Sequence, residues 1–228
     1  MNFAENILGF IKTLHFPVKV PDEIEVMNPF RDPSVLALCT QFYKKFYADS
    51  YKRWMIIGIN PGRFGGGITG VPFTDPIRLQ TVVGIINPMP KKQELSSVFV
   101  YEMIKAFGDL EAFYKNFYFT SISPLGFTKN NKNLNYYDDK LLQETVKDFA
   151  VDCLYRQLDF GIHREVAFCL GEGKNYHYLT KLNNEQKIFK LIIPLSHPRY
   201  IMQYRLKRKE EYINAYIEQF KLFCNPLN

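Results

Sequence analysis

The 228-residue chain is long enough to bury the core of one α/β domain, and its 46% apolar content excludes general disorder. The net charge of +6 and the pI of about 9.0 suit an anionic partner such as nucleic acid, although many cytosolic enzymes carry as much. The four cysteines form no Cys-x-x-Cys, so a zinc ribbon or a local iron–sulfur cluster has no support. A secretory signal pattern and a bilayer-spanning apolar run are both missing, so we expect a cytoplasmic protein with no membrane contact.

Four short runs that are apolar on nearly every residue predict strands buried on both faces, and longer amphipathic stretches between them predict helices. A Pro-rich, acidic segment over residues 17–33 predicts a loop. The alternation indicates an α/β fold with a central four-stranded, mainly parallel sheet flanked by helices, in one domain over residues 1–228. In chain order we expect the helices Phe3–Leu14 and Ser34–Tyr47, the strand Trp54–Ile59, the helix Ser96–Phe107, the strand Phe117–Ile122, the helix Asp138–Leu158, the strands Val166–Leu170 and Phe189–Pro194, and a last helix over about Ile201–Phe223.

The loop after the first strand is rich in glycine. Gly58–Phe73 reads GINPGRFGGGITGVPF, and such a run lets backbone amides approach a ligand closely. No Gly-Lys-Ser/Thr follows, so it is not a P-loop. Gly65–Gly70 fits G-x-G-x-x-G, but it lies several residues past the strand and leads into Val-Pro-Phe, whereas the dinucleotide fingerprint requires a helix. A loop this long is usually functional, and the alternative is a flexible turn.

This loop resembles the first motif of uracil-DNA glycosylases, especially the SMUG-type (single-strand-selective monofunctional) branch; Gly58–Gly62 also resembles the mismatch-specific branch. The resemblance implies that Asn60 holds the attacking water by its side-chain carbonyl and that Phe73 stacks on a flipped pyrimidine. It also implies that backbone amides near Ile59 and Gly62 approach the base. Taken alone, an Asn before Pro is typical of a turn.

A second motif, Pro194-Leu-Ser-His-Pro-Arg199, stands between the last predicted strand and the last helix. It resembles the second motif of SMUG-type enzymes, which implies that His197 donates to a carbonyl oxygen of the departing base. The mismatch-specific branch lacks this histidine, so Asn60 together with His197 points to the SMUG side. The alternative is a histidine whose hydrogen bonds are satisfied by backbone at a strand end.

The same loop departs from the usual pattern, because Arg199 follows His-Pro directly and no Asn-Pro comes after it; this spacing resembles a bacterial SMUG-like subgroup. We expect Arg199 and Tyr200 to wedge into the DNA stack, since both would lie in the loop before the helix. Just beyond, Arg205, Lys207 and Arg208 would begin the last helix and contact phosphates. A solvated helix face is the alternative.

Two further segments bear on the site. SMUG-type enzymes carry Asn-x-x-Pro-Leu after the second strand, and aligning Pro124-Leu125 places Ser121 at the position of the base-reading Asn. A hydroxyl is shorter than an amide and cannot bridge two ring atoms, so base recognition would be looser or partly backbone-mediated. The basic, amide-rich segment Lys129–Asn135 either contacts phosphates or forms a solvated loop.

These features predict a monofunctional DNA glycosylase that acts on DNA containing uracil or another damaged base, with no metal, no cofactor and no obligate protein partner, as a monomer. Neither motif contains a lysine for Schiff-base chemistry. The main alternative is a non-catalytic module that binds DNA or a modified base. A serine hydrolase is disfavoured because Ser196 and His197 are adjacent on a strand end, so that their side chains should diverge, and because no Gly-x-Ser-x-Gly is present.

Overall fold

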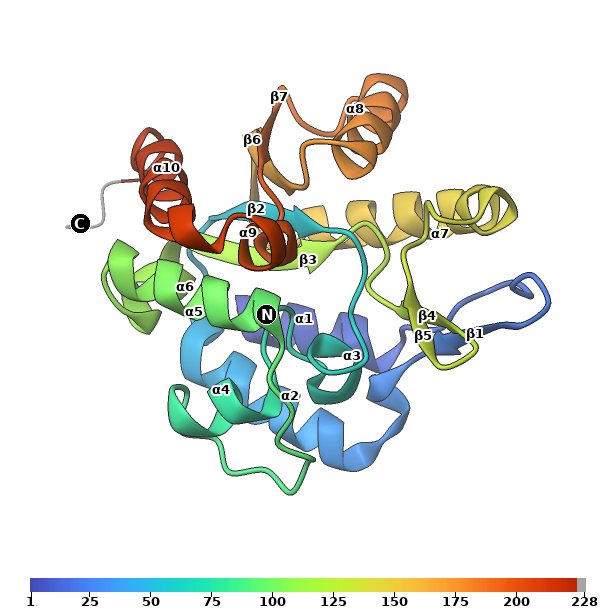
Figure 1. The fold of residues 1–228 in the computed structure, drawn as a ribbon, viewed down its shortest axis with the longest axis horizontal. Helices are drawn as coiled ribbons and strands as arrows, with labels where there is room; N and C mark the ends of the chain where they lie inside the picture. Colours follow the sequence, from blue (N-terminus) through green and yellow to red (C-terminus); the bar gives the residue numbers. More distant parts are fainter. Residues whose placement is uncertain (225–228) are drawn as a thin grey trace.

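A parallel sheet forms the centre of the computed structural model, which describes residues 1–224. Its strand order is β3-β2-β6-β7 (Figure 1). The predicted fold class, α/β with a four-stranded parallel sheet between helices, is confirmed. The strands are β2 (Arg53–Gly58), β3 (Phe117–Ser121), β6 (Ile162–Leu170) and β7 (Leu191–Leu195).

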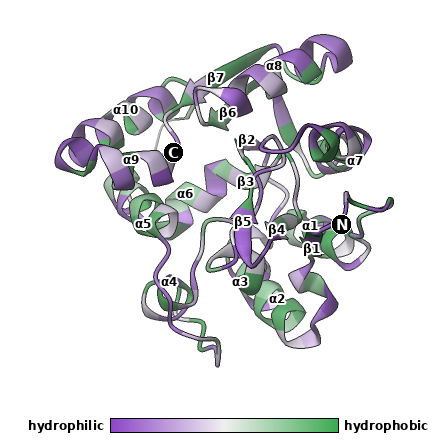
Figure 2. Cartoon of the chain, turned by 45° about the vertical axis from the view of Figure 1, so that its right-hand side comes forward, coloured by the Kyte–Doolittle hydropathy of each residue, from purple (hydrophilic) through white to green (hydrophobic). Residues whose placement is uncertain are grey.

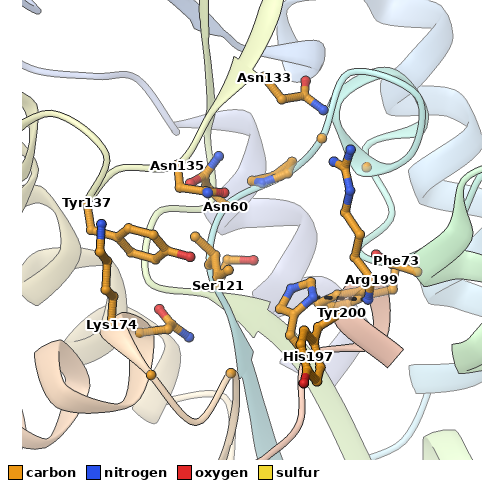
Figure 3. A pocket seen from close by; sticks show the side chains of 18 of the residues that line it. Asn60, Phe73, Ser121, Asn133, Asn135, Tyr137, Lys174, His197, Arg199 and Tyr200 are labelled. Atoms are coloured by element: carbon orange, nitrogen blue, oxygen red, sulfur yellow. Dashed lines mark hydrogen bonds between the residues drawn. The ribbon is translucent and has the colours of Figure 1, made fainter. Parts of the chain in front are cut away.

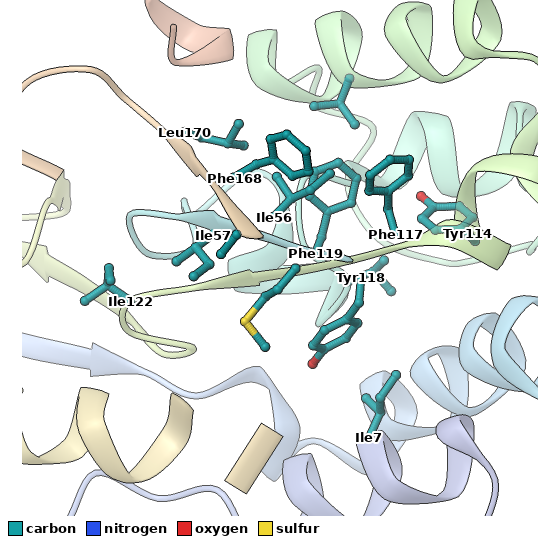
Figure 4. Close-up of a cluster of buried hydrophobic side chains, with 14 of the residues drawn as sticks. Ile7, Ile56, Ile57, Tyr114, Phe117, Tyr118, Phe119, Ile122, Phe168 and Leu170 are labelled. Carbon is teal, nitrogen blue, oxygen red and sulfur yellow. The ribbon is translucent and has the colours of Figure 1, made fainter. Parts of the chain in front are cut away.

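Helices cover both faces of this sheet. Alternate residues of a strand point to opposite faces, and β3 illustrates the result. Phe117 packs on Phe220 of the helix α10 (Lys209–Lys221), with ring centroids 4.5 Å apart, whereas Tyr118 packs on Phe3 of the helix α1 (Phe3–Lys12), at 5.4 Å. Figure 4 shows aromatic and aliphatic side chains of the strands filling both layers. The middle of the sheet is therefore covered on both faces, and the cavity described below lies at the strand ends.

The helices predicted near both ends and in the middle of the chain are present, and several short or polar ones were not predicted. The latter include α8, whose sequence holds few apolar residues and so gives a weak amphipathic pattern. The helices are α1 (Phe3–Lys12), α2 (Pro33–Tyr47), α3 (Gly66–Thr69), α4 (Pro76–Thr81), α5 (Leu95–Phe107), α6 (Leu110–Asn116), α7 (Lys140–Leu158), α8 (Lys174–Gln186), α9 (Pro198–Tyr204) and α10 (Lys209–Lys221), with short 3-10 helices η1 (Pro29–Arg31) and η2 (Leu206–Arg208).

The prediction of one continuous last helix is wrong. The chain leaves helical geometry at Arg205, where φ is −132° and ψ is 23°, and passes through η2 before α10 begins. The helix also begins earlier than predicted, with Pro198 in its first turn, where proline's missing N–H costs nothing. As a result, the residues after His197 are already helical.

A second, antiparallel sheet of order β1-β4-β5 was not predicted. β1 (Ile24–Met27) arises within the segment predicted as a Pro-rich loop, and β4 (Gly126–Lys129) and β5 (Lys132–Leu134) form a hairpin from the amide-rich segment. Its turn residues Asn130 and Asn131 have φ of 50° and 58°, the left-handed geometry that two-residue hairpins need and asparagine tolerates. Figure 2 shows β5 as strongly hydrophilic. The hairpin lies beside the carboxyl end of β2.

Across residues 1–224, no helix combines the length and the apolar character needed to cross a membrane.

Candidate functional site

A cavity of about 650 Å³ opens at the carboxyl ends of the parallel strands, where open α/β sheets bind their ligands. Asn60 follows β2, Ser121 ends β3, Gly171 follows β6 and His197 follows β7, and all four line this cavity (Figure 3). The sequence-predicted residues Ile59, Gly62, Phe73, Arg199 and Tyr200 line it too. Parallel topology therefore brings together motifs that lie more than a hundred residues apart.

Gly58, at the end of β2, leaves room for the ring of Phe73, which lines the cavity. A β-carbon on Gly58 would lie only 2.7 Å from the Phe73 ring, so the ring rests directly on the strand end. Phe73 has a φ of 53°, a strained value for a bulky residue that persists only where the surroundings enforce it. Thr69 supplies part of that restraint, because its hydroxyl donates to the carbonyl of Thr74 at 2.7 Å. The half-buried Phe73 ring is thus held facing the cavity.

Asn60 is fixed by backbone groups at the end of β5 and just after it. Its Nδ2 donates to the Leu134 carbonyl at 3.1 Å, and its Oδ1 accepts from the Tyr136 N–H at 3.0 Å. One partner only accepts and the other only donates, so the orientation of the amide is unambiguous. The Asn60 oxygen retains a second lone pair for a water molecule.

His197 caps the N-terminus of α9. Its Nδ1 accepts from the Arg199 backbone N–H at 3.1 Å, drawn as a dashed line in Figure 3. Because Nδ1 accepts, the hydrogen of the neutral ring lies on Nε2. Burial, aided by the nearby Arg199 charge, lowers the pKa of His197 to about 4. The ring is therefore a neutral Nε2–H donor at physiological pH.

The loop that carries His197 is held by contacts on both sides. The Tyr216 hydroxyl of α10 donates a hydrogen bond to the Ser196 carbonyl, and the Ser196 hydroxyl donates to Glu172 at 2.7 Å. Ser196 is thus bonded to a carboxylate rather than to His197, which removes the basis for a Ser–His nucleophile. These bonds fix the backbone from which His197 projects.

Two predictions about the DNA-facing residues need correction. Arg199 and Tyr200 lie in the first turn of α9, not in a loop, because the His197 cap and Pro198 start the helix there. Arg205, Lys207 and Arg208 are exposed, but they occupy the break between α9 and α10 rather than the start of one helix. Arg208 also pairs with Glu211 at 2.7 Å. None of these three lines the cavity.

Sequence reasoning missed several cavity-lining residues. Glu94 precedes α5 and lies against Gly62 and Gly65, with no local sequence pattern to mark it. Burial, and then the charge of Asp75, raise the pKa of Glu94 to about 7, with Arg199 opposing the shift. Asn133 and Asn135 come from the segment noted for its amides, while Tyr137 and Lys174 form the far wall.

No group of histidine, cysteine or carboxylate side chains within residues 1–224 is arranged to hold a metal ion. The four cysteines are free and buried in this part of the chain.

A family model described as the uracil DNA glycosylase superfamily matches residues 45–221, a range that includes both motifs and all four central strands. The chain belongs to this superfamily. Among solved structures, it is similar to the crystal structure of wild-type SMUG2 from Pedobacter heparinus, with 46% identity, 97% of this chain and 98% of that chain covered, and a TM-score of 0.95. The SMUG-type resemblance inferred from the two motifs is thereby confirmed. Comparison with curated proteins gave no match.

Proposed function

We propose that this chain is a monofunctional DNA glycosylase that hydrolyses the N-glycosidic bond of uracil, or of a related deaminated or modified base, in DNA. One observation carries the proposal: a neutral Nε2–H donor on His197 and the oriented amide of Asn60 line one cavity beside the Phe73 ring. Membership of the superfamily and the similarity to SMUG2 support the same function.

In the proposed reaction, bond breaking leaves negative charge on the base and positive charge on the sugar, and water then attacks the sugar cation. A damaged base leaves the stack, which costs a few kcal/mol and least for mispaired or unpaired bases, and stacks on Phe73. The C1′–N bond breaks and its electron pair stays on the base. His197 donates to a base carbonyl that gains negative charge, and such a pre-placed donor is typically worth about 3–4 kcal/mol.

Water then attacks C1′ from the side of Asn60. The Asn60 amide cannot ionise, so it orients this water and takes no proton; the proton passes to the departing base or to solvent. Turnover should accordingly be slower than in relatives with a carboxylate at this position.

Strand cleavage by Schiff-base chemistry would need an amine in the cavity. Among the residues that line it, Lys174 carries the one amine, and its Nζ lies 5.5 Å from the centroid of the Tyr137 ring. Cleavage of the strand by Schiff-base chemistry is not part of this proposal.

The exposed residues around the cavity mouth fit a DNA-binding face. Arg199 and Tyr200 project from the first turn of α9, and Arg205 lies over the Tyr200 ring at 5.5 Å. We propose that Arg199 and Tyr200 enter the stack and that Arg205, Lys207 and Arg208 contact phosphates.

The test is the formation of abasic sites. Labelled oligonucleotides that carry uracil, 5-hydroxymethyluracil, xanthine or hypoxanthine, in single and double strands, are incubated with the protein in EDTA and then treated with alkali. Strand breaks that appear only after alkali are expected for uracil. If none of the four bases yields abasic sites, the chain is not a glycosylase for them and the enzyme assignment is wrong.

A non-catalytic binder is the second candidate, and the hydrogen bonding of Asn60 is what favours it. Both ends of the amide already hold backbone groups, so a structural role alone would account for this side chain. A binder would retard lesion-bearing DNA in a gel shift without releasing base.

A further inference from the structure

Two polar side chains converge on the empty space beside the α-carbon of Gly62. A β-carbon built there would lie 3.2 Å from Oε1 of Glu94 and 3.4 Å from Nδ2 of Asn133. The other carboxyl oxygen of Glu94 occupies the space that a side chain on Gly65 would need. The glycines of this loop therefore admit a carboxyl group and an amide into the wall of the cavity.

Both groups present defined hydrogen-bonding atoms. Oδ1 of Asn133 accepts from the Arg63 backbone N–H at 3.0 Å, so its Nδ2 is the atom that faces Gly62. The backbone N–H of Glu94 donates to Asp75 at 2.9 Å, which holds the residue at the start of α5. Within residues 1–224, neither the Glu94 carboxyl group nor the Asn133 Nδ2 has a hydrogen-bond partner, so an acceptor and a donor both remain available to a ligand.

This pair lies against the glycines of the first motif and away from His197 of the second. Figure 3 shows Asn133 and His197 at opposite ends of the cavity, while both belong to its lining. A planar base whose carbonyl meets His197 would turn its opposite edge toward Gly62. At that edge, Glu94 can accept from an O–H or N–H, and Asn133 can donate to an adjacent oxygen.

We propose that Glu94 and Asn133 form a second recognition edge, which selects bases that carry a hydrogen-bond donor, a hydroxyl or a ring N–H, on the side away from His197. This inference rests on the proposed function and deepens it. Uracil offers only C–H groups at its C5–C6 edge, whereas a 5-hydroxymethyl group or the lactam of a deaminated purine offers a donor beside an acceptor. The raised pKa of Glu94, about 7, means that its carboxyl group is partly protonated near neutral pH. In either protonation state at least one of its oxygens can accept a hydrogen bond.

The experiment compares the wild type with Glu94→Gln, Glu94→Leu and Asn133→Ala. Glu111→Leu on α6, an exposed carboxylate away from the cavity, is the matched control. Single-turnover rates are measured on duplexes with uracil, 5-hydroxymethyluracil or hypoxanthine. Dissociation constants are measured in parallel with non-cleavable 2′-fluoroarabino analogues of the same three nucleotides, and thermal melting verifies that each variant is folded.

The wild type should favour a donor-bearing base over uracil, and Glu94→Leu should reduce that preference about tenfold or more, the usual loss for a hydrogen bond to a charged group. Glu94→Gln keeps a carbonyl acceptor and should retain part of the preference, and Asn133→Ala should lose less than Glu94→Leu. A loss confined to 5-hydroxymethyluracil identifies the hydroxyl as the group read; one confined to hypoxanthine identifies the ring N–H.

Equal losses on all three bases, or a preference unchanged in Glu94→Leu, would overturn the inference and leave Glu94 as a support of the glycine-rich loop. Absence of base release from every substrate would instead overturn the proposed function, and the ratios of dissociation constants would still decide the role of Glu94.

Discussion

The Arg199 backbone N–H donates to Nδ1 of His197 at 3.1 Å, so that one hydrogen bond starts α9 and also fixes which nitrogen of the ring carries hydrogen. The cap makes the ring a rigid Nε2–H donor without a charge. Helix capping and the proposed leaving-group chemistry thus depend on the same contact.

The first prediction concerns pH. The pKa of His197 is lowered to about 4, so the ring stays neutral as pH falls through 6.5 and becomes charged only near pH 4. Single-turnover release of uracil should therefore show no step near pH 6.5. The profile is best measured in the Glu94→Gln variant, because Glu94 itself titrates near pH 7. A step near pH 6.5 that disappears in His197→Asn would mean that the ring protonates in the active protein.

The second prediction concerns the leaving base. His197→Ala should slow single-turnover release of uracil by about 10²–10³-fold, the usual loss for one oxyanion-type donor. His197→Asn restores a donor and should recover part of the rate. The defect should shrink for 5-fluorouracil, whose anion is more stable and needs less help. Equal defects on uracil and 5-fluorouracil would assign His197 to loop shape or base flipping.

The third prediction separates the two roles of Asn60. Asn60→Ala should slow base release by about 10²-fold, the cost of removing one positioning group, while affinity for abasic-site DNA stays near that of the wild type. It should also lower the free energy of unfolding by about 1–3 kcal/mol, because the Leu134 carbonyl and the Tyr136 N–H lose their partner. Denaturant melts and single-turnover rates measure the two effects. A rate above about a tenth of the wild type's would leave Asn60 with the structural role alone.

The fourth prediction concerns stability through Glu94. The folded chain holds this proton to about pH 7, whereas the unfolded chain releases it near 4.5. Folded stability should therefore fall as pH rises from 4.5 to 7 and remain lower above 7. Glu94→Gln should match the wild type at pH 4.5 and exceed it at pH 8 by about 1–2 kcal/mol, allowing for partial exposure. Thermal melts at both pH values test this, with Glu111→Gln as the control; a difference that does not change with pH would show that Glu94 is charged throughout.

The fifth prediction concerns docking. Replacing Arg205, Lys207 and Arg208 together by Gln should weaken DNA binding to a similar extent across sequences, because phosphates carry no sequence information. The slope of log affinity against log salt should flatten by up to about one unit for each phosphate that is no longer neutralised. Fluorescence anisotropy at several salt concentrations measures the slope. An unchanged slope would make the group a solvated surface only.

The strand ends were predictable because buried parallel strands are continuously apolar and because parallel topology gathers the loops that follow them at one edge. Asn60, Phe73 and His197 therefore meet as their motifs predicted. Residues outside such local sequence patterns could not be assigned to the site. Glu94 stands in no motif, and only the folded chain brings it against Gly62 and Gly65.

Hydrogen bonds between residues far apart in the chain were likewise not predictable from local sequence patterns. Asn60 bonds backbone groups more than seventy residues away, at and just after β5. That strand has three residues and is largely exposed, so no apolar pattern predicts it. The break at Arg205 escaped prediction because the apolar period continues on both sides of it. Local propensity there gives way to the packing of α9 and α10 against α5.

The central claim is that this chain hydrolyses a glycosidic bond in DNA. The most direct measurement is mass spectrometry of the small-molecule fraction after the protein is incubated in EDTA with a uracil-containing oligonucleotide. We expect free uracil together with an equimolar, uncleaved abasic strand, and a strong loss of both in the Asn60→Ala, His197→Ala double variant. Bound but intact uracil-containing DNA, with no free uracil, would contradict the claim.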